Sequence, residues 1–258
     1  MGKVDFRSPH ESYINIKNAL KDTPINCVVR FGDKSPSDKG LVECNTADAV
    51  TASANKRLMK SLFDTYGVTH ANWAYSYDGV NTLSFPIVAK HPLGSKGTGV
   101  YLLKTKERFN EWWAKRTHHN YIFEEFHDYS REYRLLCNQK ECFLAVRKVL
   151  KKFVVKNKWK KGGDNTYWYG INNPKFETPV NWELICNEAV KAVKAVGLDI
   201  GGVDVKVQAA FNKEGVERKS PKFIVLEVNS APCGWGEKTT KSLIDETRKV
   251  IIAKSHPS

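Results

Sequence analysis

The segments GVDVKVQ (residues 202–208) and KFIVLEVNSAP (residues 222–232) decide the fold of this chain. Each is a short apolar run with the length of a strand, and each carries acidic or amide side chains. Residues two apart on a strand share a face, so Glu227 and Asn229 point the same way. If the two segments pair as neighbouring strands, Asp204 joins them. The sequence thus predicts a cluster of oxygen-bearing side chains at the end of an apolar sheet.

Such a cluster suits Mg²⁺, which takes one or two carboxylates and completes its shell with water and substrate phosphates. An unpaired carboxylate among Ile, Val and Leu is costly to bury, so these groups need a partner. The alternative is structural: Asp204 forms a salt bridge with Lys206 on the same strand.

A glycine-rich turn, Gly94-Ser95-Lys96-Gly97-Thr98-Gly99, joins the predicted strands at residues 85–91 and 99–104. Glycine lets backbone N–H groups approach an anion closely. The turn lacks the Gly-Lys-Ser/Thr ending of a Walker loop, and it joins two strands rather than a strand and a helix. It is therefore either a tight hairpin or a lid that folds over phosphates. Lys90, in the strand before it, either faces an anion or lies exposed on the surface.

The remaining pattern predicts an α+β fold with antiparallel sheets, since strands and helices mix without regular βαβ alternation. Helices are predicted at residues 53–66, 105–116, 181–196 and 241–254, the first capped by Ser53 and ended by Gly67. Further strands are predicted at residues 25–31, 121–126, 132–137, 141–149 and 150–156. Residues 157–180, which contain several Gly, Asn and Pro residues, are predicted to form a long loop.

Charge is distributed unevenly along the chain. The 258 residues include 41 Lys and Arg against 28 Asp and Glu, a formal net charge of +13. Residues 140–161 hold nine basic residues and one acidic residue. This segment either attracts phosphates and acidic polymers or is a solvated hairpin.

The composition also indicates the cellular compartment to expect. No apolar run approaches the roughly 20 residues that a membrane helix needs, and the first residues lack the apolar core of a signal peptide. The six cysteines form no CxxC pair, which is typical of reduced thiols. We therefore expect a cytoplasmic protein with no membrane segment and no zinc site.

Taken in chain order, the motifs resemble the ATP-grasp superfamily. The order is Asn55-Lys56-Arg57-Leu58, Pro-Ile-Val-Ala-Lys90, the glycine-rich turn, Glu124-Glu125-Phe126, Glu132-Tyr133-Arg134, Gly-Val-Asp204 and Leu-Glu227-Val-Asn229-Ser-Ala-Pro. The resemblance spans about residues 50–240, and the ordered set is more specific than any single motif. It is nearest to the carboxylate–amine ligases of the ribosomal-protein glutamate ligase type, including compact phage-borne members.

The resemblance implies two α+β lobes that hold ATP between them. The small lobe, with the glycine-rich lid, would span residues 51–125, and the large lobe, with the metal site, residues 126–258. The usual N-terminal domain would be truncated to residues 1–50.

The resemblance also implies roles for individual residues. Lys56 and Lys90 would contact the ATP phosphates, and Gly94, Ser95, Lys96, Gly97 and Gly99 would close over them. Glu124, Glu125 and Phe126 would lie at the adenine, and Glu132, or alternatively Asp128, at the ribose. Asp204, Glu227 and Asn229 would hold two Mg²⁺ ions, with Mn²⁺ as the alternative metal. Arg134 and Arg147 would face the γ-phosphate or the acyl phosphate and act in catalysis with Lys90.

The implied reaction forms an amide bond between a carboxylate and an amine through an acyl phosphate, with release of ADP and phosphate. The acceptor stays open, and Arg30, residues 157–180 or a partner protein would recognise it. An acidic peptide, a protein tail or a nucleotide-linked substrate would suit the basic segment. Trp159, Tyr167, Trp168 and Tyr169 would stack on bases, grip a peptide or pack back on the core.

Two other functions remain as alternatives. A kinase shares a glycine-rich lid and Mg²⁺, but the chain has no HRD or DFG motif. A nucleic-acid-binding protein without catalysis would use the positive charge, with residues 140–161 as the contact, and its affinity would fall steeply with salt.

Overall fold

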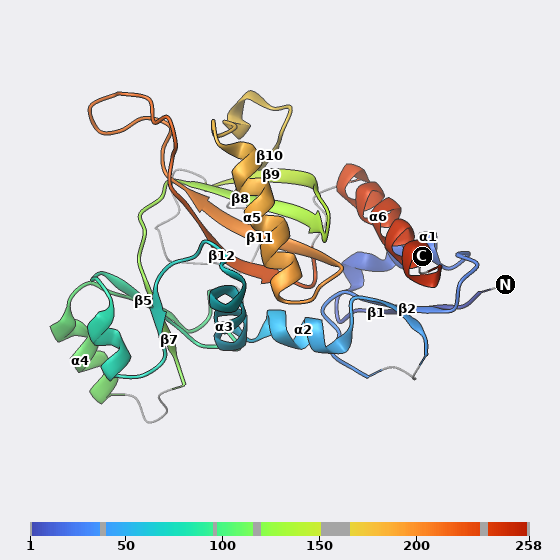
Figure 1. Ribbon diagram of the computed structural model, residues 1–258, viewed down its shortest axis with the longest axis horizontal. Coiled ribbons are helices and arrows are strands. Elements are labelled where there is room, and N and C mark those ends of the chain that lie inside the picture. Colours follow the sequence, from blue (N-terminus) through green and yellow to red (C-terminus); the bar gives the residue numbers. More distant parts are fainter. Residues whose placement is uncertain are drawn as a thin grey trace.

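The computed structural model describes residues 2–36, 40–94, 97–115, 120–150, 166–232 and 237–256. Three β-sheets follow one another along the longest axis of the molecule, and both chain ends lie at the same end of it (Figure 1). A five-stranded sheet occupies the middle, with a three-stranded sheet beside the termini and a four-stranded sheet at the far end. Within the described residues, no helix has the length and apolar character needed to cross a membrane.

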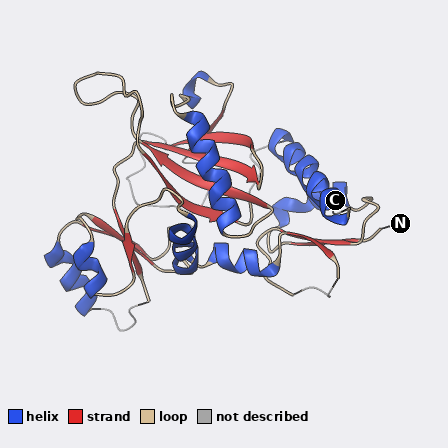
Figure 2. Cartoon of the chain, viewed as in Figure 1, coloured by secondary structure: helices blue, strands red, loops and turns tan. Residues whose placement is uncertain are grey.

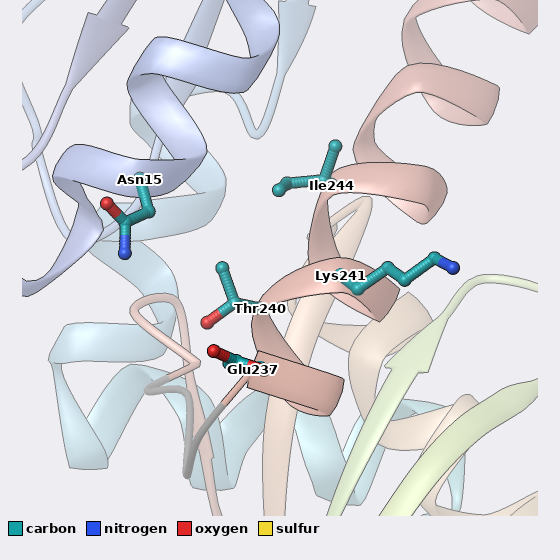
Figure 3. A pocket seen from close by; sticks show the side chains of 5 residues that line it. All are labelled: Asn15, Glu237, Thr240, Lys241 and Ile244. Carbon is teal, nitrogen blue, oxygen red and sulfur yellow. The ribbon is translucent and has the colours of Figure 1, made fainter.

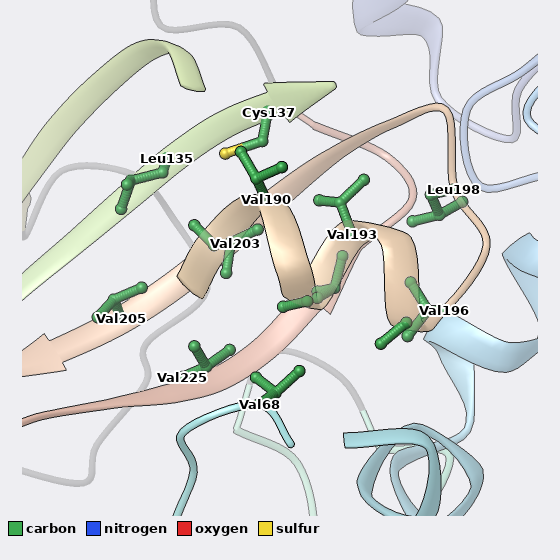
Figure 4. Packing of buried hydrophobic residues seen from close by; sticks show 14 of the residues in the cluster. Val68, Leu135, Cys137, Val190, Val193, Val196, Leu198, Val203, Val205 and Val225 are labelled. Atoms are coloured by element: carbon green, nitrogen blue, oxygen red, sulfur yellow. The ribbon is translucent and has the colours of Figure 1, made fainter. Parts of the chain in front are cut away.

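The middle sheet is antiparallel throughout. Its strand order is β10 (Thr166–Gly170), β9 (Cys142–Leu150), β8 (Arg131–Asn138), β11 (Ile200–Val207) and β12 (Phe223–Asn229). Helix α5 (Trp182–Ala195) lies across one face (Figure 2). Leu135, Val203 and Val205 pack there together with Val193 of the helix (Figure 4). Because side chains alternate along a strand, the intervening residues lie on the opposite face.

Helices α2 (Ala47–Ala54) and α3 (Lys56–Tyr66) border the same core, in which Phe63 is fully buried. The helix predicted at residues 53–66 is confirmed from Lys56 to Tyr66, but its predicted start at Ser53 is wrong, because Ser53 belongs to α2 and the chain breaks at Asn55. The Asn55 side-chain oxygen accepts hydrogen bonds from the backbone N–H groups of Arg57 and Leu58 and caps α3. Gly67 ends α3 as predicted, with φ of +63°.

The four-stranded sheet is also antiparallel. Its order is β4 (Trp73–Ala74), β7 (Ile122–Glu125), β5 (Ile87–Lys90) and β6 (Val100–Leu103). Helix α4 (Lys106–Ala114) covers one face, where Phe109 packs on Phe123. Strand alternation therefore turns Glu124 and Lys90 to the other face.

The three-stranded sheet, β1 (Val4–Arg7), β2 (Cys27–Arg30) and β3 (Val42–Cys44), is parallel. It packs with α1 (Ile14–Leu20) and α6 (Glu237–Ser255). The sequence predicted only β2 of these strands, because strands of three or four residues give little periodic signal. Leu136 and Leu144 of the middle sheet pack against this unit and cover one end of the face opposite α5.

The predicted α+β class and the antiparallel pairing of the two larger sheets are confirmed. The predicted loop at residues 157–180 is partly wrong, because residues 166–170 form β10 and pair with β9. The part of the predicted strand at residues 150–156 that follows Leu150 lies outside the described residues, as does Trp159. The five cysteines that the structure describes are free thiols.

Candidate functional site

Polar residues of β8, β11 and β12 meet on the face of the middle sheet opposite α5. Asp204 lies directly opposite Arg134 on one neighbouring strand and Glu227 on the other. Gly202, two residues earlier, lies opposite Asn229. Directly paired residues of antiparallel strands share a face, so the register gathers these side chains into one cluster.

Arg134 and Asp204 form the central ion pair of this cluster. Arg134 Nε lies 2.5 Å from Asp204 Oδ1, and Nη2 lies 2.6 Å from Oδ2. The Asn229 amide donates to Asp204 Oδ2 and to the Gly202 carbonyl at 3.4 Å each. The alternative of an Asp204–Lys206 salt bridge is wrong, because Arg134 is the partner of Asp204.

Glu227 has a different environment. Burial and the adjacent Asp204 carboxylate raise its pKa, while the charges of Lys56, Lys90 and Arg134 act in the opposite direction. Among the described residues, the Glu227 carboxylate forms neither a hydrogen bond nor an ion pair. Glu227 is therefore a partly buried acid beside another acid, within electrostatic reach of three cations.

The donor set is the one that Mg²⁺ uses. Two carboxylates and an amide oxygen are hard ligands, and they leave coordination positions for water and phosphate oxygens. In the parts of the chain that the structure describes, no group of three or more His, Cys, Asp and Glu side chains is placed to hold a metal unaided. Asp204, Glu227 and Asn229 thus offer a partial set of hard ligands, which water and phosphate oxygens would complete.

Two lysines approach this cluster from β5 and α3. Lys90 Nζ lies 2.9 Å from Glu124 Oε2. Lys56, at the start of α3, donates a hydrogen bond to the Gly94 carbonyl. Burial lowers the pKa of Lys56, and the charge of Glu227 counteracts this effect. Both lysines thus lie within electrostatic reach of Glu227.

The glycine-rich turn begins beside Lys56. Gly97 and Gly99 have φ of +76° and +71°, a region that favours glycine. A Cβ atom on Gly94 would lie 2.5 Å from the Thr98 carbonyl oxygen, so the turn closes tightly on itself. Ser95 and Lys96, which were predicted to close over phosphates, lie outside the described residues.

The three residues predicted at the adenine separate in the structure. Glu124 is almost fully buried, at 3% exposure, on the face of the four-stranded sheet that carries Lys90. Glu125 points the other way, where it accepts hydrogen bonds from the Ser84 N–H and the Asn72 amide. The Phe126 N–H donates to the Pro86 carbonyl. Of the two glutamates, only Glu124 shares a face with Lys90.

Arg147 lies away from the cluster. It is opposite Tyr133, which packs under α5, so its side chain leaves the sheet on the helix side. There it forms an ion pair with Glu177 at 2.6 Å and donates to the Lys175 carbonyl at 2.9 Å. The expectation that Arg134 and Arg147 face one group is not met, because they lie on opposite faces.

Lys148 is the basic residue of β9 that shares the face of Arg134. It lies opposite Glu132 on β8, and the two side chains form an ion pair at 2.7 Å. Glu132 thus lies on the site face with a cationic partner, while its alternative, Asp128, lies in the segment between β7 and β8. Lys148 is not among the residues that the sequence predicted for the site, although the strand period separates it from Arg147.

The aromatic residues of β10 are divided by the same alternation. Trp168 lies opposite Lys148, and the Arg134 guanidinium carbon is 5.8 Å from its ring centroid. Tyr167 and Tyr169 leave the strand on the other side, where their rings are stacked at 6.1 Å. Only Trp168 of these three lies on the site face.

Arg30 is not available as an acceptor contact. Its side chain is fully buried, pairs with Glu43 at 3.2 Å and donates to the Ser35 and Asn45 carbonyls. The suggestion that it recognises the acceptor is therefore wrong, and its role is structural.

Two surface pockets lie outside this cluster. One, of about 430 Å³, lies between α1 and α6 (Figure 3) and is lined by Asn15, Glu237, Thr240, Lys241 and Ile244. Another, of about 350 Å³, lies beside β6 and α4. Neither pocket includes a residue of the cluster around Asp204.

No protein-family model matches the chain, and no curated protein matches it in sequence. Solved structures do resemble it. D-alanine–D-alanine ligase from Bacillus anthracis has a TM-score of 0.63 and 14% identity, with 98% of this chain and 96% of that chain covered. The ATP-grasp ligase PsnB with a minimal precursor has a TM-score of 0.54 and 16% identity, with 84% and 65% covered.

N5-carboxyaminoimidazole ribonucleotide synthetase from Thermotoga maritima has a TM-score of 0.53 and 16% identity, with 83% of this chain and 53% of that chain covered. A second structure of the Bacillus anthracis ligase is a complex with ATP, and another of PsnB contains Mg and ADP. At this level of identity the likeness shows a shared fold.

Proposed function

We propose that this chain, which has the ATP-grasp fold, is an ATP-dependent ligase that joins a carboxylate to an amine. The reaction proceeds through an acyl phosphate and releases ADP and phosphate. One observation carries the proposal: Asp204, Glu227 and Arg134 form a single cluster within electrostatic reach of Lys56 and Lys90. Carboxylates beside a set of cations suit a metal-bound polyphosphate.

The proposed roles divide between the two larger sheets. Lys56, Lys90 and the turn at residues 94–99 bind the phosphates, Glu124 lies near the adenine, and Glu132 or Asp128 binds the ribose. Asp204, Glu227 and Asn229 hold Mg²⁺, for which we propose two ions. Residues 51–125 and 126–258 act as the lobes that hold ATP, with residues 1–50 as a reduced N-terminal region.

The proposed reaction needs ATP because the substrate carboxylate must first be activated. A carboxylate is unreactive toward an amine because its leaving group would be oxide, whereas an acyl phosphate releases phosphate. When bound, Mg²⁺ neutralises charge that develops on the transferred phosphoryl group. Arg134 and Lys148 place positive charge on the same face, where they stabilise the phosphoryl oxygens and the oxyanion formed on amine attack.

For the substrate we propose the carboxylate of an acidic peptide or protein, in a reaction of the ribosomal-protein glutamate ligase type within the cytoplasm. The net charge of +13 favours an acidic partner. The structure of PsnB with its precursor peptide is a precedent on the same fold. The motifs also resemble those of compact phage-borne ligases, and we propose that origin.

Phosphorus NMR of Mg-ATP with the protein and a pool of amino acids and acidic peptides tests this function. The proposal predicts ADP and phosphate in equal amounts, formed only when a carboxylate and an amine are both present. AMP and pyrophosphate would exclude the acyl phosphate and indicate adenylation. Phosphorylated product in the absence of any amine would indicate a kinase.

A further inference from the structure

Lys60 is a fully buried lysine, at 0% exposure, one helical turn after Lys56 on α3. Its Nζ lies 3.5 Å from Glu124 Oε2, the oxygen that Lys90 Nζ contacts at 2.9 Å. Two ammonium groups thus share one carboxylate oxygen. Within the described residues, Lys60 Nζ and Glu124 Oε1 have no hydrogen-bond partner.

Such an arrangement is costly to bury, so its charge balance matters. Two lysines and one glutamate sum to a single positive charge. If Lys60 were neutral, Glu124 and Lys90 would form an isolated pair with no net charge. The extra charge cannot act by touching a ligand, because Lys60 is buried while the Lys90 side chain is 17% exposed.

We propose that Lys60 is a positioning residue whose charge helps to neutralise Glu124, so that Lys90, which also contacts Glu124, keeps positive charge to offer an anionic group of the nucleotide. This inference rests on the proposed function, since it takes Lys90 as a phosphate contact. Lys60 acts through Glu124 and does not touch the nucleotide. It also connects α3, which carries Lys56, to β7, so both phosphate-facing lysines depend on one buried contact.

A purely structural role makes a different prediction. The Lys60 stem lies beside Phe63, with Nζ 5.6 Å from the ring centroid, and loss of packing would weaken the fold generally. In that case neutralising Glu124 would bring no recovery. If Lys60 instead balances charge, neutralising Glu124 removes the carboxylate that holds Lys90, and nucleotide affinity should recover.

The test is calorimetric titration of Mg-AMPPNP into the full chain. Lys60→Met should raise the dissociation constant about tenfold, which corresponds to about 1.4 kcal/mol. Lys60→Arg, which keeps the charge, should bind within about threefold of wild type, a difference of under 1 kcal/mol. Adding Glu124→Gln to Lys60→Met should bring the dissociation constant back to that of Glu124→Gln alone, the non-additivity expected of residues in one network.

Lys254→Met is the matched control, because it breaks a 2.7 Å ion pair with the buried Asp199 in another part of the fold. It should leave nucleotide affinity unchanged. If Lys60→Met fails to fold, the double variant and Glu124→Gln are compared directly, and unequal affinities would overturn the inference. Wild-type affinity in Lys60→Met, or a loss that Glu124→Gln does not relieve, would also overturn it. A wild-type protein that binds no Mg-AMPPNP would instead refute the proposed function, and the inference with it.

Discussion

Arg134 donates hydrogen bonds to both carboxylate oxygens of Asp204 on the neighbouring strand, from Nε at 2.5 Å and from Nη2 at 2.6 Å. The planar guanidinium suits this two-point contact, which an ammonium group cannot reproduce. The pair fixes Asp204 beside Glu227 and offsets part of the repulsion between the two acids. Arg134 therefore organises the two acids that we propose to bind metal, and in the proposed reaction it would also supply positive charge.

Replacing Arg134 with lysine tests this arrangement. The substitution keeps the positive charge but loses the two-point contact of the guanidinium with Asp204. We therefore expect kcat for ADP formation to fall about 10-fold to 100-fold. Arg108→Lys is the matched control, because Arg108 forms an exposed ion pair with Glu111 on α4. Equal rates for the two variants would remove Arg134 from the mechanism.

The next prediction separates Arg147 from Lys148. Lys148→Met removes a cation from the site face, and we expect kcat/KM to fall about 10-fold or more. Arg147→Met removes the contacts to Glu177 and Lys175, so we expect a loss of stability of about 1 kcal/mol with little change in kcat. Steady-state kinetics and denaturant unfolding of both variants measure these two effects separately. The reverse pattern would contradict the face assignment.

The buried Glu124 makes stability sensitive to acid. Burial alone would raise the pKa of Glu124, but the charges of Lys60 and Lys90 have the larger effect. The net result is a pKa lowered from 4.5 to about 2. A lowered pKa stabilises the fold above pH 4.5, and this contribution is lost as the pH falls toward 2. The difference in free energy of unfolding between wild type and Glu124→Gln should therefore shrink between these pH values. A constant difference would show that Glu124 is not held as a carboxylate.

Asn45 joins the N-terminal sheet to the middle sheet. Its buried amide donates to the Arg30 and Ile200 carbonyls and accepts from the N–H groups of Asp199 and Ile200. Asn45→Ala leaves these buried groups unpaired, so we expect a loss of about 3 kcal/mol. Asn212→Ala, at an exposed turn, is the control and should cost under about 1 kcal/mol. Similar losses in urea unfolding would contradict the role of Asn45 as a connector.

The sequence predicted the strands that build the site because their apolar runs are long enough to show their period. It also predicted that Asp204, Glu227 and Asn229 lie together, because the last two strands of the chain, once paired, allow only a few registers that keep their apolar residues on one face. The missing information is register. A shift of one residue reverses the face of the sheet. The sequence therefore predicted Arg147 for the site, whereas Lys148 lies on the site face.

Other features depend on tertiary contacts that no local pattern reveals. Lysine is normally exposed, so nothing in residues 53–66 marks Lys60 as buried against Glu124 from a distant strand. Strand β10 lies among glycines and asparagines and forms by pairing with β9. The short strands β1 and β3 are likewise fixed by β2 between them rather than by their own sequences.

The most direct test of the central claim is calorimetric titration of Mg-ATP into wild type and Glu227→Gln, with Glu217→Gln in the exposed turn as the control. The account predicts one saturable site in wild type and in the control, and affinity about tenfold weaker or worse in Glu227→Gln. With the metal removed by EDTA, the three proteins should bind ATP equally weakly. Absence of binding to wild type, or equal affinity of all three proteins in the presence of Mg²⁺, would contradict a metal-dependent nucleotide site at Asp204 and Glu227.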